Sequence, residues 1–151
     1  MYTILQGRVS MPARRHNITG GITMVTATSK ERNYVTEITD GEHIIYSDTI
    51  ASDNGTGEYV NPADMVISAL AACLNITPRK RMRAEGLVWD NVTVHVDMNR
   101  KNPEDIKIYT KIIIEGDIPQ EKKDELIANV LDCPICKVLR GNKTFLPLEM
   151  E

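Results

Sequence analysis

Alternation of apolar and polar side chains is clearest in the second half of the chain. Every second residue is apolar from Val92 to Met98, and the same alternation runs from Ile106 to Ile114. A period of two is typical of a strand with one buried face. The polar segment Asn99–Asp105 separates the two runs. This pattern predicts two strands that pair as a hairpin.

Two further strands and a third extended run are predicted before residue 50. The segments Ile22–Ser29 and Asn33–Thr39 are rich in Val, Ile and Thr, which favour strands. Asp40-Gly41 then predicts a tight turn into a third extended run, Glu42–Thr49. The composition of Ser52–Gly57 indicates a loop.

A long helix is predicted to follow that loop. Asn61 is a good N-cap, Pro62 suits the first helical position, and Gly86 is expected to end the helix. Pro78 predicts a kink in it. The apolar face of this helix is expected to contain the following residues: Met65, Val66, Ala69, Leu70, Cys73 and Ile76.

The last third of the chain alternates between helical and extended patterns. Gln120–Leu131 predicts an amphipathic helix. Cys133-Pro134 predicts the start of a short helix that ends at Arg140-Gly141-Asn142, and Thr144–Met150 is expected to form a last strand. The residues of the amphipathic helix expected to face inward are Leu126, Ile127, Val130 and Leu131. The whole order predicts an α+β fold rather than a repeated βαβ pattern.

Composition narrows the class of protein. The 151 residues predict a single domain over 1–151, and 42% hydrophobic with 26% charged residues is ordinary for a soluble globular chain. A net charge of −3 gives no general attraction to nucleic acid or to an anionic membrane. The start of the chain does not show the pattern of a signal peptide. Three cysteines do not suit a secreted disulfide framework, so we expect a cytoplasmic protein with reduced thiols.

The cysteines are the candidate chemical groups. One thiol, Cys73, is remote in sequence from Cys133 and Cys136, as a two-cysteine redox cycle requires, although free cysteine is also a common core residue. The helix start at Cys133 favours its thiolate. Cys73 is expected about three turns inside its helix, where burial raises a thiol pKa. A reactive Cys73 therefore requires a cation from elsewhere in the sequence.

The motifs around these thiols resemble the OsmC/Ohr family of osmotically inducible and organic-hydroperoxide-resistance proteins. Asn61-Pro62, the small-residue run and Ala72-Cys73 are similar to the family's central helix with its peroxide-attacking cysteine. Cys133-Pro134 and the following Arg140-Gly141-Asn142 are similar to its second-cysteine segment. The resemblance runs from about residue 22 to residue 150 and leaves residues 1–20 poorly matched.

The resemblance implies an intertwined homodimer in which antiparallel sheets pack around a long central helix. It implies a thiol-dependent peroxidase that prefers organic hydroperoxides, needs no metal or bound cofactor, and is reduced by an external dithiol. In this role Cys73 attacks the peroxide, Cys133 forms a disulfide with it, and Arg32 lowers the pKa of Cys73. Asp64 or Glu58 orients Arg32. Cys136 stands where relatives commonly have Ser, so the resemblance gives it no role.

Other interpretations stay open. The organic-hydroperoxide branch has an acidic residue directly after Asn-Pro, where this chain has Ala63; this favours a redox-sensing or small-molecule-binding protein with little turnover as the alternative. Arg32 can equally be a solvated strand residue, and Asp64 a capping carboxylate. One Cys-x-x-Cys is a weak zinc signal, and it lacks the βαβ context of thioredoxin. The basic run Arg79–Arg83 suits a helix C-terminus, and the acidic balance of the chain argues against nucleic acid.

Overall fold

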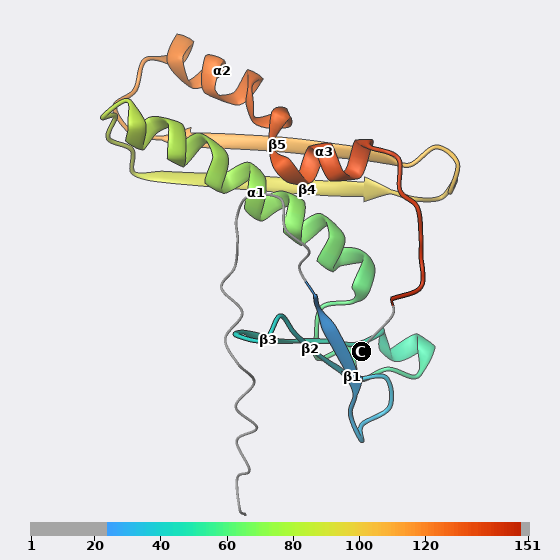
Figure 1. Ribbon diagram of the computed structural model, residues 1–151. Coiled ribbons are helices and arrows are strands. Elements are labelled where there is room, and N and C mark those ends of the chain that lie inside the picture. Colours follow the sequence, from blue (N-terminus) through green and yellow to red (C-terminus); the bar gives the residue numbers. More distant parts are fainter. Residues whose placement is uncertain (1–23, 149–151) are drawn as a thin grey trace, which may run out of the picture. The chain divides into compact units, whose positions relative to one another are not determined.

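The computed structural model describes residues 24–148, which fall into two compact units that divide at Pro62 (Figure 1). The boundary lies at the first residue of the long helix. The single domain expected from chain length stays a prediction.

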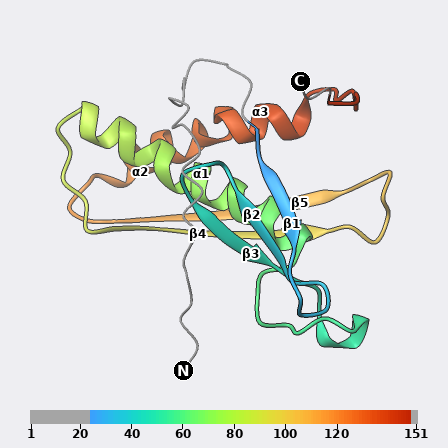
Figure 2. The same cartoon turned by 60° about the horizontal axis from the view of Figure 1, so that its bottom comes forward.

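The first unit contains a three-stranded antiparallel sheet in the order β1-β2-β3 (Figure 2). Its strands are β1 (Thr26–Ser29), β2 (Thr36–Thr39) and β3 (Ile44–Ser47). The register pairs Thr28 with Glu37 and Ile38 with Ile45. The three predicted strands are confirmed within the described residues, but each is shorter than its sequence pattern suggested.

The turns account for the missing strand residues. Between β1 and β2 the N–H of Lys30 donates to the carbonyl of Val35, and the N–H of Val35 donates to that of Arg32, both at 2.9 Å. Residues 30–35 are therefore used to reverse the chain. At the predicted Asp40-Gly41 turn, one carboxylate oxygen of Asp40 accepts the backbone N–H groups of Glu42 and His43 at 2.9 and 2.8 Å.

The second unit is built on a long hairpin, β4 (Asn91–Asn99) and β5 (Lys107–Glu115). The two strands pair antiparallel over their whole length, with Val92 opposite Ile114 and Val96 opposite Thr110. This confirms the prediction from the period-two pattern. Both strands match the predicted runs to within one residue at each end.

The predicted long helix is α1 (Pro62–Ala84), which has 23 residues and continues past Pro78. Its C-terminal end is closed by Gly86, which has a φ of 69° that glycine adopts without a steric cost. The N–H of Leu87 donates to the carbonyl of Met82 at 2.9 Å. Across residues 24–148, no helix has the length and apolar character needed to cross a membrane.

Three shorter helical segments follow the hairpin: α2 (Gln120–Ala128), η2 (Val130–Asp132) and α3 (Pro134–Arg140). The predicted helix over 120–131 therefore changes to a 3-10 turn after Ala128. Leu126 and Val130 are buried as predicted, but Leu131 is 40% exposed, which corrects its inward assignment. The tighter 3-10 turn rotates Leu131 away from the position that a continued α-helix would give it.

The core of this unit consists of two clusters of buried side chains. The first contains Leu70, Leu74, Val130, Cys133 and Cys136. The second contains Met82, Val92, Ile114, Ile118 and Leu126. Val94 and Ile112 of the hairpin pack against both clusters. Figure 1 shows α1 crossing the hairpin obliquely, and Leu70 and Leu74 of α1 belong to the first cluster. Antiparallel sheets with helices packed in this way match the predicted α+β class.

The strand predicted at Thr144–Met150 is absent from the described residues 144–148, so the prediction is wrong for that part. Residues 149 and 150 lie outside the described range. The apolar residues Phe145, Leu146 and Leu148 are largely exposed. A strand forms only where a neighbouring strand accepts its backbone hydrogen bonds, and none among residues 24–148 pairs with this segment.

Candidate functional site

Two of the predicted site residues, Cys73 and Cys133, meet in the second unit. Cys73 is half-buried on α1 and packs against the cluster that contains Cys133 and Cys136. The Cys133 thiol is close enough to raise the pKa of the Cys73 thiol. All three cysteines are free thiols in this structure. The two thiols that sequence reasoning paired are therefore neighbours across 60 residues of chain.

The second thiol pair, Cys133 and Cys136, is held at the beginning of α3. Cys133 is the N-cap residue with an extended backbone, and Pro134 occupies the start of the helix, as predicted. The N–H of Cys136 donates to Cys133 Sγ at 3.4 Å, and the two Sγ atoms lie 3.2 Å apart. Both residues are buried, with 1% and 5% of their surface exposed. Sequence reasoning placed the helix start but gave Cys136 no part in the site.

The surroundings of Cys73 favour its protonated form. Burial is the main cause and raises the pKa of the Cys73 thiol above its ordinary value of 9.0, because an ionised sulfur loses hydration there. Contact with Cys133 acts in the same direction. The backbone of Ile135 and the side chain of Thr77 act in the opposite direction and lower this pKa. This agrees with the expectation that burial inside the helix raises the pKa of Cys73.

Arg32, the predicted source of that charge, lies in the first unit and pairs with Glu58. The guanidinium donates two hydrogen bonds to the two carboxylate oxygens of Glu58, at 2.9 and 2.7 Å. Both side chains are at least half exposed, at 61% and 50%. Hydrogen bonding by Arg32 lowers the pKa of Glu58 below its ordinary 4.5, so its carboxylate stays ionised at neutral pH. Sequence reasoning had left Glu58 and Asp64 as alternatives for this contact.

A buried carboxylate, Asp48, shapes the loop that carries Glu58. Asp48 is 2% exposed, and its oxygens accept the N–H groups of Thr49, Thr56 and Gly57 as well as the Thr56 hydroxyl. The Thr56 hydroxyl is the main cause that lowers the pKa of Asp48. Asp48 thus fixes both ends of the loop over residues 49–57. Sequence reasoning missed it, although an aspartate directly before a Gly- and Ser-rich loop was the available signal.

The same loop depends on glycine at position 55. A Cβ built on Gly55 would lie 2.0 Å from the carbonyl oxygen of Thr49, which leaves no space for any side chain. The close approach of the two backbone segments brings the chain back toward β3, where Ser47 and Val60 form an isolated bridge. Glu58 is therefore presented by a tightly closed loop.

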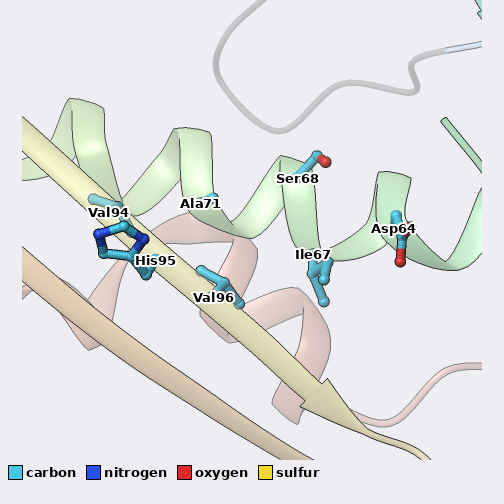
Figure 3. Close-up of a pocket in the computed structure, with 7 residues that line it drawn as sticks. All are labelled: Asp64, Ile67, Ser68, Ala71, Val94, His95 and Val96. Atoms are coloured by element: carbon cyan, nitrogen blue, oxygen red, sulfur yellow. The ribbon is translucent and has the colours of Figure 1, made fainter.

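Asp64, the fourth predicted site residue, lines a hollow of about 310 Å³ between α1 and β4 (Figure 3). The other residues that line it are Ile67, Ser68, Ala71, Val94, His95 and Val96. Nine positions along α1, about two and a half turns, separate Asp64 from Cys73. Two and a half turns place the two side chains on opposite sides of the helix. Asp64 is therefore not part of the Cys73–Cys133 contact.

The described residues thus bring the predicted site together in two groups. Cys73 and Cys133 are in contact in the second unit, and Arg32 is oriented by Glu58 in the first. Within residues 24–148, no group of three or more His, Cys, Asp or Glu side chains is arranged to hold a metal ion. The second unit therefore offers the chemistry of neighbouring free thiols, and the first unit offers a guanidinium held by a carboxylate.

Comparison with known proteins adds a family assignment to this geometry. A family model described as OsmC-like protein matches residues 55–146, which is more than half of the chain. The matched range contains Glu58 and all three cysteines but not Arg32. A comparison of the sequence with curated proteins gives no match.

Solved structures share the fold at low sequence identity. An OsmC-like protein of Mycoplasma pneumoniae superposes with a TM-score of 0.64 at 22% identity, covering 80% of this chain and 89% of the other. An organic hydroperoxide resistance protein OsmC of Legionella pneumophila gives 0.58 at 23%, covering 81% and 91%. The organic hydroperoxide resistance protein OhrB of Bacillus subtilis gives 0.54 at 23%, covering 81% and 93%.

Proposed function

Because this chain belongs to the OsmC-like protein family, we propose that it is a thiol-dependent peroxidase that reduces organic hydroperoxides. The contact between Cys73 and Cys133 is the observation that carries the proposal. A two-cysteine peroxidase needs one thiol that reacts with peroxide and a second thiol close enough to capture the oxidised sulfur. The packing of two free thiols from distant parts of the chain supports the proposal.

The proposed reaction has three steps. The Cys73 thiolate attacks one oxygen of the hydroperoxide, the O–O bond breaks, and the alcohol leaves while Cys73 becomes a sulfenic acid. The thiol of Cys133 then attacks the Cys73 sulfur, an S–S bond forms, and water leaves. An external dithiol finally reduces this disulfide by two exchange steps and is itself oxidised to a disulfide. None of these steps requires a metal or an organic cofactor.

The first step requires Cys73 to ionise, and its surroundings in the second unit oppose that. We propose that Arg32 supplies the positive charge and also holds the peroxide oxygen. Glu58 orients Arg32 in this scheme, because a bidentate pair fixes the plane of the guanidinium. The scheme therefore assigns to Glu58 the orienting role for which Asp64 was the other candidate.

We further propose that the active form is an intertwined homodimer in the cytoplasm. The surface of α1 beside Cys73 supports this proposal. Val66 and Ile76 are each 45% exposed, and the small residues Ala69 and Ala72 between them are exposed as well. These four positions form one stripe of the helix, next to the face that Leu70 and Leu74 bury. Such a stripe allows close approach by another apolar surface.

The alternative function is a redox sensor or small-molecule-binding protein with little turnover, which Ala63 in place of the acidic residue favours. Peroxide consumption separates the two. The reduced protein is mixed with excess dithiol and with either cumene hydroperoxide or hydrogen peroxide, and the Cys73→Ser variant serves as the control. We expect many turnovers per chain, faster with the organic peroxide, and none in the variant. Consumption that stops after one equivalent per chain would instead support the sensor.

A further inference from the structure

Cys133 has two thiol neighbours, because Cys73 packs against the cluster that contains it and Cys136 Sγ lies 3.2 Å from its own Sγ. We propose that Cys136 is a third redox-active residue, which takes the disulfide over from Cys73 and leaves Cys133 and Cys136 joined. This inference rests on the proposed function for the origin of the first disulfide. It assigns a role to the thiol that the family resemblance left without one.

The distances suit a disulfide between Cys133 and Cys136. A bonded pair of sulfurs lies about 2.05 Å apart, so the two Sγ atoms need to approach by only about 1.2 Å. The N–H of Cys136 already donates to Cys133 Sγ, which keeps that sulfur over the first turn of α3. Both sulfurs are carried by one short segment that Pro134 holds in helical conformation. Their approach requires no movement of one element past another.

The transfer is a thiol–disulfide exchange without any net oxidation. The Cys136 thiolate attacks Cys133 Sγ in the Cys73–Cys133 disulfide, a Cys133–Cys136 bond forms, and the Cys73–Cys133 bond breaks. Cys73 leaves as a thiolate and takes up the proton that Cys136 gave up. The backbone of Ile135 acts to lower the pKa of the Cys73 thiol, which favours its departure as a thiolate.

The consequence is that Cys73 becomes a thiol again before any external reductant arrives. The oxidising equivalent is then stored in a pair that is 1% and 5% exposed, whereas Cys73 is only half-buried. The oxidised chain would keep a reduced peroxide-attacking residue. A buried disulfide is also less accessible to bulky reductants, which predicts selectivity for a small or well-fitting dithiol.

The test is the pattern of disulfides after one oxidising equivalent. Reduced wild-type protein and the Cys136→Ser variant each receive slightly less than one equivalent of cumene hydroperoxide, are quenched in acid and alkylated, and are mapped without reduction. We expect a Cys133–Cys136 disulfide with alkylated Cys73 in the wild type, and a Cys73–Cys133 disulfide in the variant. A wild-type protein that keeps the Cys73–Cys133 disulfide would overturn the transfer.

A second oxidant separates this inference from the proposed function. One equivalent of 5,5′-dithiobis(2-nitrobenzoate) forms the first disulfide by exchange, without any peroxide chemistry. The same wild-type end state, Cys133–Cys136 with Cys73 reduced, is expected. If peroxide fails to react but this oxidant yields the expected pair, the peroxidase proposal fails and the transfer stands. If this oxidant leaves Cys73 in the disulfide, the transfer is wrong whatever the peroxide result.

Discussion

Arg32 and Glu58, which are 26 residues apart, form a bidentate ion pair with N–O distances of 2.9 and 2.7 Å. The pair fixes the guanidinium plane, and the loop that carries Glu58 is closed by the buried carboxylate of Asp48. An exposed ion pair of this kind contributes little to stability. In the proposed mechanism this pair has the role of orienting Arg32.

Substitution of Arg32 by Met should make Cys73 less acidic. Burial, with a contribution from Cys133, raises the pKa of the Cys73 thiol above its ordinary 9.0, and in the proposed mechanism Arg32 lowers it. The alkylation rate of Cys73 rises with pH as the thiol ionises. In the variant, this rise should occur at a pH on the order of one to three units higher, the usual effect of one close charge.

Lys30→Met is the matched control for that experiment, because Lys30 is a nearby cation that pairs with Glu37 at 2.7 Å. Its alkylation profile should coincide with that of the wild type. If Arg32→Met leaves the profile unchanged while Lys30→Met shifts it, Lys30 is the activating cation and the assignment of Arg32 is wrong.

Glu58→Gln should slow peroxide reduction more than Asp64→Asn. The amide of Gln retains one acceptor but loses the charge that holds both guanidinium nitrogens, so Arg32 becomes less well oriented. If the substitution raised the pKa of Cys73 by one unit, kcat/KM near neutral pH would fall about tenfold. Steady-state rates of peroxide reduction by the two variants show which carboxylate orients Arg32. A larger loss in Asp64→Asn would identify Asp64 as the orienting carboxylate.

Cys133→Ser should preserve the first reaction with peroxide but prevent its completion. Without a thiol beside it, the sulfenic acid of Cys73 is exposed to further peroxide and becomes sulfinic or sulfonic acid. Intact mass should rise by two or three oxygen atoms on Cys73 with excess peroxide. Formation of a stable Cys73–Cys136 disulfide in this variant would mean that Cys133 is not the required partner.

Leu74→Ala should destabilise the second unit strongly. Leu74 is fully buried in the cluster that contains Cys133 and Cys136. Loss of a buried leucine side chain typically lowers the free energy of unfolding by about 2–5 kcal/mol. Val88→Ala is the control, because Val88 is 79% exposed and should change stability by less than about 0.5 kcal/mol. Urea unfolding of both variants measures the difference, and equal effects would contradict the assigned core.

The sequence predicted those helices and strands that are marked by the pattern of their own residues. The period-two alternation identified β4 and β5, and Asn61-Pro62 and Cys133-Pro134 identified where α1 and α3 begin. These features depend on a side chain and its immediate backbone neighbours. The resemblance to the OsmC/Ohr family then suggested roles for residues that are remote in sequence, and these roles stay proposals.

Features that depend on distant partners could not be predicted in the same way. The segment Thr144–Met150 has strand-like composition, but residues 144–148 form no strand because composition does not supply a neighbouring edge. Three contacts depend on how the chain folds back. They are the pairing of Arg32 with Glu58, the hydrogen bonds to the buried Asp48 carboxylate, and the 3.2 Å distance between Cys133 Sγ and Cys136 Sγ. Sequence reasoning named Glu58 only as a second candidate and gave Cys136 no role.

The central claim, that Cys73 is the residue that peroxide oxidises, is tested most directly by trapping its sulfenic acid. The Cys133→Ser/Cys136→Ser double variant removes both neighbouring thiols and so lengthens the life of that species. It is treated with one equivalent of cumene hydroperoxide in the presence of dimedone, and the labelled peptide is identified by mass spectrometry. The account predicts stoichiometric dimedone addition at Cys73. A Cys73 that stays an unlabelled thiol while the peroxide persists would contradict it.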